Sequence, residues 1–249
     1  MSTRALATST LVLALSAIAA CSSTSTSSVA ASDGGAGTDG DIADGGGGGT
    51  MCTSARNQLL APVAKTSKAA VSVASTSSAT KVVYVDASAG GVNGGAVNPR
   101  VYVNLDTVTR VDLTDTAAFT SAGWDLALKR TTIYSNSGDA GIGVGGAQQV
   151  SKAFASVTAA DATAVAAESF FDDMCTAKTD PIGGPLSAFS DWYDYDMATN
   201  IPTPKSNVTY IVRGGTGKLF KVAIKSYTGL ADGGAGTATG YFLLDVAAL

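Results

Sequence analysis

Cysteine offers the clearest chemistry in this sequence, which holds three cysteines and no histidine among its 249 residues. Cys21 ends the run Ile18-Ala19-Ala20-Cys21, which matches the lipobox that signal peptidase II cleaves before a lipidated cysteine. Arg4 and the apolar residues 11–20 have the charge and length of an export signal, about half the roughly 20 residues of a spanning helix. We therefore expect lipid on Cys21, and an ordinary cleaved signal peptide is the alternative.

The other two cysteines predict a disulfide. If Cys21 carries lipid, Cys52 and Cys175 remain, and two cysteines in an exported protein are usually paired. The bond would stabilise the fold by about 4–5 kcal/mol in the chain-entropy model. It would also attach the segment around Cys52 to the loop that follows Phe170-Phe171. A metal or redox site is the weaker alternative, because the chain has neither a CxxC spacing nor a histidine.

The absence of histidine also excludes most familiar catalytic sites. A Ser-His-Asp relay, a histidine-paired cysteine and a histidine-bearing zinc or non-haem iron site all require a residue that this chain lacks. Carboxylate pairs remain as the acid–base option, and no pair has an arrangement that indicates catalysis. We expect a protein that is not an enzyme.

Two acidic clusters offer further alternatives. Asp191, Asp194 and Asp196 surround Trp192-Tyr193, an arrangement that can bind a sugar, although it is also typical of a half-buried strand or surface loop. Asp172-Asp173 follow two phenylalanines and could join a calcium site, but the spacing of an EF-hand loop is missing. We prefer the structural interpretation for both clusters.

Composition divides the chain into an export part and a folded part. With 16 basic and 20 acidic residues, it has a formal net charge of −4 and no basic footprint for nucleic acid. Small polar residues and glycine dominate residues 22–50, which cannot bury a core. We predict a signal peptide at 1–20, a lipid anchor and flexible linker at 21–50, and one domain at 51–249, with its core at about 81–249.

The pattern of apolar residues predicts a mainly β domain with one or two short helices. An irregular or briefly helical lead-in is expected at 51–80, and a helical stretch in the alanine-rich residues 147–167. In the last hairpin, Phe220, Val222 and Ile224 share one face, which we expect to be buried. The expected strands are 81–86, 100–105, 124–134, 207–213, 218–227 and 240–246.

Several short motifs, in a fixed order, resemble the HmuY family of exported haem-binding lipoproteins from Gram-negative bacteria. The motifs span about residues 100 to 245, and the ordered set is more specific than any single one. They are Gly123-Trp124-Asp125-Leu126-Ala127-Leu128, Arg130, Asn136-Ser137-Gly138, Trp192-Tyr193-Asp194-Tyr195, Arg213, Gly217-Lys218-Leu219-Phe220-Lys221 and Ser226-Tyr227.

The resemblance implies a mostly antiparallel β fold that grips haem between loops with two axial side chains, a histidine pair or a methionine pair. This chain departs from the pattern, because it has no histidine and Asn200 stands where some relatives have one. Met174 and Met197 lie roughly where the family's ligands fall, so they are the candidate axial ligands of haem iron. Alternatively, Met174 fills core space and Met197 is a loop residue.

The sequence therefore predicts an HmuY-like lipoprotein, anchored to the outer membrane at its periplasmic face or at the cell surface. Its expected role is to bind haem or another tetrapyrrole and to deliver it to an outer-membrane transporter. The alternative is a surface interaction module that keeps the fold but binds a protein or a glycan through the loops at 191–204.

Overall fold

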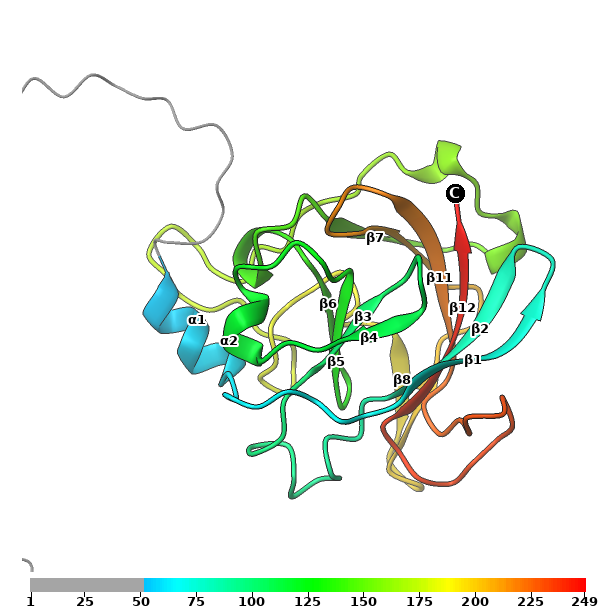
Figure 1. Cartoon of the computed structure of the whole chain (residues 1–249), viewed down its shortest axis with the longest axis horizontal. Helices are drawn as coiled ribbons and strands as arrows, with labels where there is room; N and C mark the ends of the chain where they lie inside the picture. Colours follow the sequence, from blue (N-terminus) through cyan, green and yellow to red (C-terminus); the bar gives the residue numbers. More distant parts are fainter. Residues whose placement is uncertain (1–51) are drawn as a thin grey trace, which may run out of the picture. The chain divides into compact units, whose positions relative to one another are not determined.

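The structure, a computed structural model, describes residues 52–249 (Figure 1). The predicted signal peptide, the linker, Cys21 and Met51 lie outside the described residues. Within them the fold is mainly antiparallel β with two short helices, α1 (Thr53–Leu60) and α2 (Asp115–Ala118), as predicted. None of the helices in this part of the chain is long and apolar enough to cross a membrane.

Two sheets and a separate hairpin contain the strands, and every pair of neighbouring strands is antiparallel. The larger sheet has the order β1 (Val71–Ser77), β2 (Thr80–Asp86), β12 (Tyr241–Ala248), β11 (Leu219–Ser226), β10 (Thr209–Arg213), β7 (Gly146–Val150). The smaller sheet has the order β4 (Thr109–Val111), β3 (Val101–Asn104), β5 (Leu126–Lys129), β6 (Thr132–Ser135). The hairpin consists of β8 (Tyr193–Asp196) and β9 (Ile201–Pro204).

The larger apolar core includes residues from both sheets. On β11 the predicted alternation is confirmed, since Phe220, Val222 and Ile224 are buried in this core and Lys221 lies on the other face. Leu126 of β5 belongs to the same core. Because strand side chains alternate between faces, the next residue of β5 faces a second core on the opposite side.

The second core joins the smaller sheet to the helices. Trp124, Tyr134 and Phe170 are buried there with Leu60 of α1 and Ala118 of α2. In Figure 1, α1 and α2 lie on one side of β3, β5 and β6, and β11 and β12 lie on the other. The smaller sheet is therefore covered on both faces.

The lead-in is fastened to this second core by a disulfide and by one carboxylate. The predicted bond between Cys52 and Cys175 is confirmed, with a Cα–Cα distance of 5.3 Å. The Asp115 carboxylate accepts hydrogen bonds from the Val63 N–H at 3.0 Å and from the Arg100 guanidinium at 3.2 Å. Residues 51–80 were expected to be irregular or briefly helical; α1 fits this, whereas strand β1 was not expected.

The expectation of a single strand at 124–134 is wrong. The chain turns at Arg130, whose φ of 53° lies in the left-handed region, and β5 and β6 pair as a hairpin around it. The Arg130 N–H donates to the Ala87 carbonyl at 2.7 Å, which holds the turn against the end of β2. The alternation of apolar residues continues through both arms, so periodicity alone did not reveal the turn.

The expected helix at 147–167 is also wrong. Its first residues form β7, which pairs with β10, and the rest contains two short 3₁₀ helices, η2 (Phe154–Ser156) and η3 (Ala159–Asp161). Gln148 of β7 connects this strand to residues 161–164, because its side chain accepts from the Ala164 N–H and donates to the Asp161 carbonyl. Pairing along the edge of the sheet thus overrides the helix propensity of alanine.

Candidate functional site

A cavity of about 610 Å³ is the strongest candidate for a ligand site. Five separate segments line it: the loop after β2, the β5–β6 turn, the turn at 180–184, the β8–β9 hairpin, and the connection from β11 to β12. Its apolar and aromatic walls come from Val92, Ile182, Tyr193, Tyr195, Pro202 and Tyr227. A cavity with mainly apolar walls and few polar groups is typical of sites for small molecules and cofactors.

The floor of the cavity is rigid because it rests on an aromatic cluster. Tyr227 packs against Trp192 and Phe242, with ring centroids 5.3 Å and 5.1 Å away. The Trp192 indole N–H donates to the Thr131 carbonyl at 2.9 Å, which ties the cluster to the β5–β6 turn. Trp192 is thus buried behind the cavity, and its neighbour Tyr193 forms part of the wall.

The β8–β9 hairpin supplies one wall and carries the first predicted ligand. Tyr195 donates its hydroxyl hydrogen to the Asn200 side chain at 3.0 Å across the turn. Asp196 caps the same turn by accepting from the Ala198 N–H and the Thr199 hydroxyl. Met197 lies in this turn with 81% of its surface exposed. It is beside the cavity but is not one of its lining residues.

Met174 lies in a different turn. It precedes Cys175 and is 88% exposed, so the alternative that it fills core space is wrong. Backbone bridges join Phe171 to Ala177 and Thr179 to Pro185, which places the turn at 172–176 and the turn at 180–184 at opposite ends of a short meander. Only the second of these turns lines the cavity.

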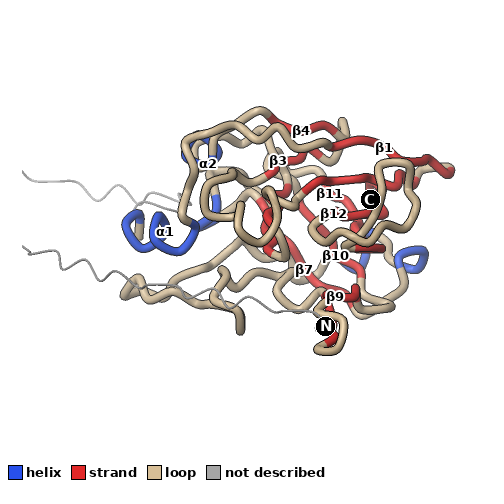
Figure 2. The backbone as a smooth tube through the Cα atoms, turned by 90° about the horizontal axis from the view of Figure 1, so that it is seen from below, coloured by secondary structure: helices blue, strands red, loops and turns tan. Residues whose placement is uncertain are grey.

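The two methionines are therefore not brought together. The disulfide holds the turn of Met174 beside the start of α1, and both views place α1 apart from the β8–β9 hairpin (Figures 1 and 2). Ligation of one iron by Met174 and Met197 stays a prediction. Asn200, in contrast, does line the cavity.

Sequence reasoning missed two polar side chains that line the cavity and lack strong partners among the described residues. Arg130 lies at its edge, and its guanidinium makes a single long hydrogen bond, 3.4 Å, to the Thr239 carbonyl. The Tyr227 hydroxyl is buried without a hydrogen-bond partner among the described residues. Burial raises the pKa of Tyr227 to about 12, so its phenol keeps its proton at neutral pH. Arg130 and Tyr227 both belong to the family motifs, and this was the signal in the sequence that could have identified them as site residues.

The motif residues around β5 and β6 build the fold. The Trp124 indole donates to the Ala118 carbonyl, and the Asp125 carboxylate accepts from the backbone N–H groups of Leu105 and Gly215. The Asn136 amide donates to the Trp124 carbonyl at 2.9 Å. Burial raises the pKa of Asp125, while the two backbone donors oppose this shift. These buried contacts explain a recurring motif without any ligand.

The acidic clusters have local structural partners. Lys205 forms ion pairs with Asp191 and Asp194, and Asp172 accepts from the N–H groups of Met174 and Thr176. These hydrogen bonds lower the pKa of Asp172. Within residues 52–249, no group of three or more acidic or cysteine side chains is placed to hold a metal ion.

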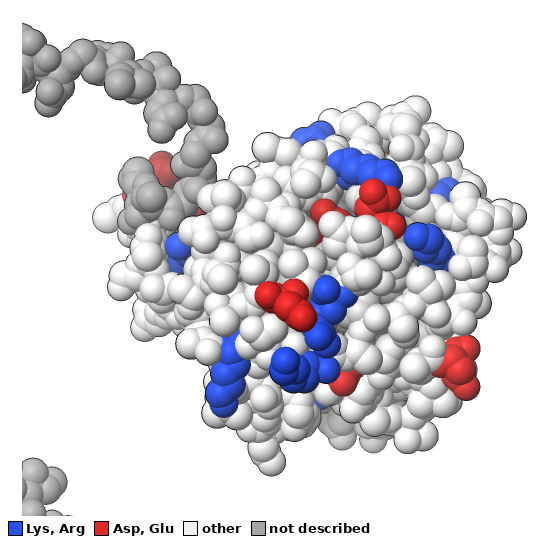
Figure 3. Space-filling view, viewed as in Figure 1, with Lys and Arg blue, Asp and Glu red and all other residues white. Residues whose placement is uncertain are grey.

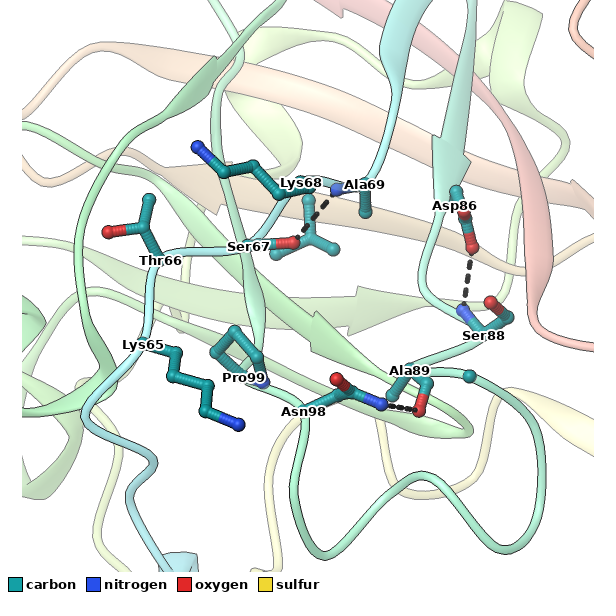
Figure 4. A pocket seen from close by; sticks show the side chains of 12 residues that line it. Lys65, Thr66, Ser67, Lys68, Ala69, Asp86, Ser88, Ala89, Asn98 and Pro99 are labelled. Carbon is teal, nitrogen blue, oxygen red and sulfur yellow. Dashed lines mark hydrogen bonds between the residues drawn. The ribbon is translucent and has the colours of Figure 1, made fainter.

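A second cavity, of about 450 Å³, is polar (Figure 4). Its groups bond to near neighbours: Ser67 accepts from the Ala69 N–H, Asp86 from the Ser88 N–H, and Asn98 donates to the Ala89 carbonyl. None of the described residues that line it is aromatic. This cavity therefore lacks the aromatic walls of the first one.

Surface charge is mixed. On the face shown in Figure 3, basic side chains lie beside acidic ones and much of the surface is uncharged. Among the described residues, Arg110 and Asp112 form an ion pair at 2.7 Å. The face carries no continuous basic stripe, in keeping with the net charge of −4.

Comparison with protein-family models matched residues 97–241 to the family described as HmuY protein. The match covers more than half of the 249 residues and includes every strand from β3 to β11. Comparison with curated proteins found no match.

Among the solved structures that this chain matches are three from bacteria. A protein of Bacteroides vulgatus ATCC 8482, assigned as an HmuY-like haem-binding protein, has a TM-score of 0.45 and 18% identity, covering 72% of this chain and 97% of its own. An apo HmuY analogue of Tannerella forsythia has a TM-score of 0.41 and 15% identity, with 74% and 97% coverage. A protein of Bacteroides fragilis NCTC 9343, assigned as a lipoprotein, has a TM-score of 0.42 and 20% identity, with 70% and 92% coverage.

Proposed function

The chain belongs to the HmuY family, and from this membership we propose that it binds haem or a related tetrapyrrole as a non-enzymatic carrier. In this proposal residues 1–20 direct export, residues 21–50 provide the lipid anchor at Cys21 and a flexible linker, and residues 51–249 bind the ligand. The anchor holds the protein at the outer membrane, where an outer-membrane transporter receives the ligand.

The cavity beside the β8–β9 hairpin is the observation that carries the proposal. Its volume of about 610 Å³ falls within the range of roughly 300–1,000 Å³ that is usual for small-molecule and cofactor sites. A tetrapyrrole is a flat aromatic body, and the rings of Tyr193, Tyr195 and Tyr227 offer faces and edges on which such a body packs. Burial of the macrocycle among these side chains supplies most of the affinity.

The proposal assigns axial ligation to Met197 and Met174. Thioethers are soft ligands that haem iron accepts, and both side chains are exposed at the surface. Met197 belongs to the hairpin that forms the cavity wall. Met174 is the more demanding assignment, since its turn lies at the other end of a short meander and would have to move.

The direct test is a haem titration of the purified protein, followed by absorption spectroscopy before and after dithionite is added. We expect a saturable Soret shift that sharpens into a low-spin ferrous spectrum, because thioethers favour ferrous over ferric iron. No shift beyond that of an unrelated protein would contradict haem binding and favour the alternative of a protein or glycan ligand.

Two variants separate ligation from packing. Met197→Leu and Met174→Leu keep an apolar side chain of similar volume but remove the sulfur. Loss of the low-spin ferrous spectrum in either variant identifies that thioether as a ligand. Retention of the spectrum in Met174→Leu, with loss in Met197→Leu, would remove Met174 from the site.

A further inference from the structure

One side chain sets the charge of the aromatic cavity. Of the described residues that line it, Arg130 alone carries a charge, and none is acidic. The cavity therefore has apolar walls and a single positive group at one edge. Such a distribution favours a ligand with an apolar body and one anionic substituent.

Arg130 is held in place by its backbone, and its side chain is left available. Its N–H donates to the Ala87 carbonyl, and its φ of 53° fixes the direction of the turn. The guanidinium has five N–H donors, and only the long bond to the Thr239 carbonyl uses one. Within residues 52–249 it forms no ion pair. Most of its hydrogen-bonding capacity is thus free.

Tyr227 provides a second unused donor in the same cavity. The residue is 2% exposed, and its hydroxyl has no partner in the described part of the chain. A buried polar group without a partner costs free energy, so such groups in native proteins usually meet a water molecule or a ligand. Burial raises the pKa of this phenol and Arg130 opposes the shift, and both residues line the same cavity.

We infer that Arg130 and the Tyr227 hydroxyl together form a carboxylate subsite at the edge of the aromatic cavity, which receives a propionate group of the tetrapyrrole. This inference rests on the proposed function and adds the feature of the ligand that is recognised. An arginine fork matches a carboxylate, and a phenol O–H adds a further donor to the same anion. The ligand class is a flat tetrapyrrole carboxylic acid, because the aromatic walls suit a planar ring system.

The test uses iron-free protoporphyrin IX, so that axial ligation does not enter. Fluorescence titrations in one low-detergent buffer compare this dicarboxylic acid with its dimethyl ester, which has the same ring. We expect the acid to bind the wild-type protein roughly 10- to 100-fold more tightly than the ester, as charge-assisted hydrogen bonds would give. Palmitate, an apolar carboxylate without an aromatic plane, should not compete at similar concentration.

Arg130→Gln should remove this preference. It should weaken binding of the acid by roughly 10-fold or more and leave binding of the ester unchanged. Arg110→Gln, which removes the same charge from β4 outside the cavity, is the matched control and should change neither. Equal binding of acid and ester by the wild type, or an unchanged preference in Arg130→Gln, would overturn the subsite while the proposed function stands.

Tyr227→Phe tests the second donor. We expect it to weaken binding of the acid by a few-fold and to leave the melting temperature of the ligand-free protein unchanged or higher, since an unpaired hydroxyl is removed. A lower melting temperature, with unchanged binding, would show that the hydroxyl has a structural role and would overturn its place in the subsite. If the wild type binds neither porphyrin nor haem, the proposed function fails together with the subsite. Competition by palmitate at equal strength would overturn the tetrapyrrole assignment.

Discussion

Two regions beside the smaller sheet, which we call the disulfide end and the cavity end, differ in how their polar groups are hydrogen-bonded. At the disulfide end, defined by α1, α2 and the turn at 172–176, the buried Asp115 carboxylate accepts from the Arg100 guanidinium, the Tyr102 hydroxyl and the Val63 N–H. At the cavity end, defined by the β5–β6 turn, the turn at 180–184 and the β8–β9 hairpin, Arg130 and Tyr227 keep most of their donors unused.

This difference separates stability from binding. The hydrogen-bonded Asp115 carboxylate stabilises its core, although the Nε atoms of Arg56 and Arg100 at that end are buried without a partner among the described residues. The unused donors of Arg130 and Tyr227 remain available to a ligand and cost stability until one arrives. Substitutions at the disulfide end, apart from the proposed ligand Met174, should therefore change the free energy of unfolding and leave ligand affinity unchanged. Substitutions at the cavity end should change ligand affinity and leave the free energy of unfolding unchanged.

Removal of the disulfide should have the largest effect on stability. In the Cys52→Ala/Cys175→Ala variant the unfolded chain is no longer closed into a loop between two residues that are 123 positions apart. The chain-entropy model predicts a loss of about 4–5 kcal/mol. Urea unfolding followed by circular dichroism measures it, with the reduced wild type as a control. A loss below about 1 kcal/mol would show that the packing of α1 alone secures the lead-in.

The carboxylate of Asp115 should come next. Asp115→Ala leaves the Arg100 guanidinium buried without its carboxylate, which typically costs about 3–5 kcal/mol. Asp112→Ala is the matched control, because it removes an Arg–Asp pair at the surface and should leave unfolding unchanged within error. Equal effects of the two substitutions in urea unfolding would contradict the special role of the disulfide end.

Glu168 should make stability depend on pH. Burial raises its pKa to about 7 in the folded protein, above the usual value of 4.5, even though Ser135 donates two hydrogen bonds to it. The folded state thus binds a proton that the unfolded state has lost, so stability should fall as pH rises from about 4.5 to about 7. The loss is on the order of a few kcal/mol, by about 1.4 kcal/mol for each pKa unit.

Glu168→Gln should flatten this dependence, because glutamine keeps the acceptor oxygen and does not ionise. The slope of unfolding free energy against pH, measured between pH 4.5 and 8, is the readout. Asp125 remains in the variant, and burial raises its pKa as well, so a smaller slope of the same sign should persist. An unchanged slope would exclude Glu168 as its source.

Local chemistry made much of this fold predictable from sequence. Cysteine pairing in an exported chain predicted the bond of Cys52 with Cys175, and alternation on β11 predicted its buried face. The turn at Arg130 and the strand at the start of 147–167 were missed. In both cases the deciding partners, the Ala87 carbonyl and strand β10, are distant in sequence.

The candidate site was less predictable for the same reason. The cavity draws on five segments, and residue spacing does not show which loops meet. Met174 and Met197 were chosen because they lie roughly where the family's ligands fall, yet the disulfide holds one of them beside α1. Arg130 and Tyr227 stand within family motifs, but only the three-dimensional structure shows that both line one cavity and lack partners.

The smallest change in stability should come from the removal of a tyrosine hydroxyl at the cavity end, and the same removal at the disulfide end provides the comparison. Tyr195→Phe removes an exposed hydroxyl bond to Asn200 at the cavity end and should change stability by less than about 0.5 kcal/mol. Tyr102→Phe removes a buried bond to the Asp115 carboxylate and should cost about 1.5–3 kcal/mol. Urea unfolding measures both, and titration with protoporphyrin should show a change only for Tyr195→Phe. Because the deleted atom is the same, equal stability losses would mean that the two ends do not divide stability from binding as we infer.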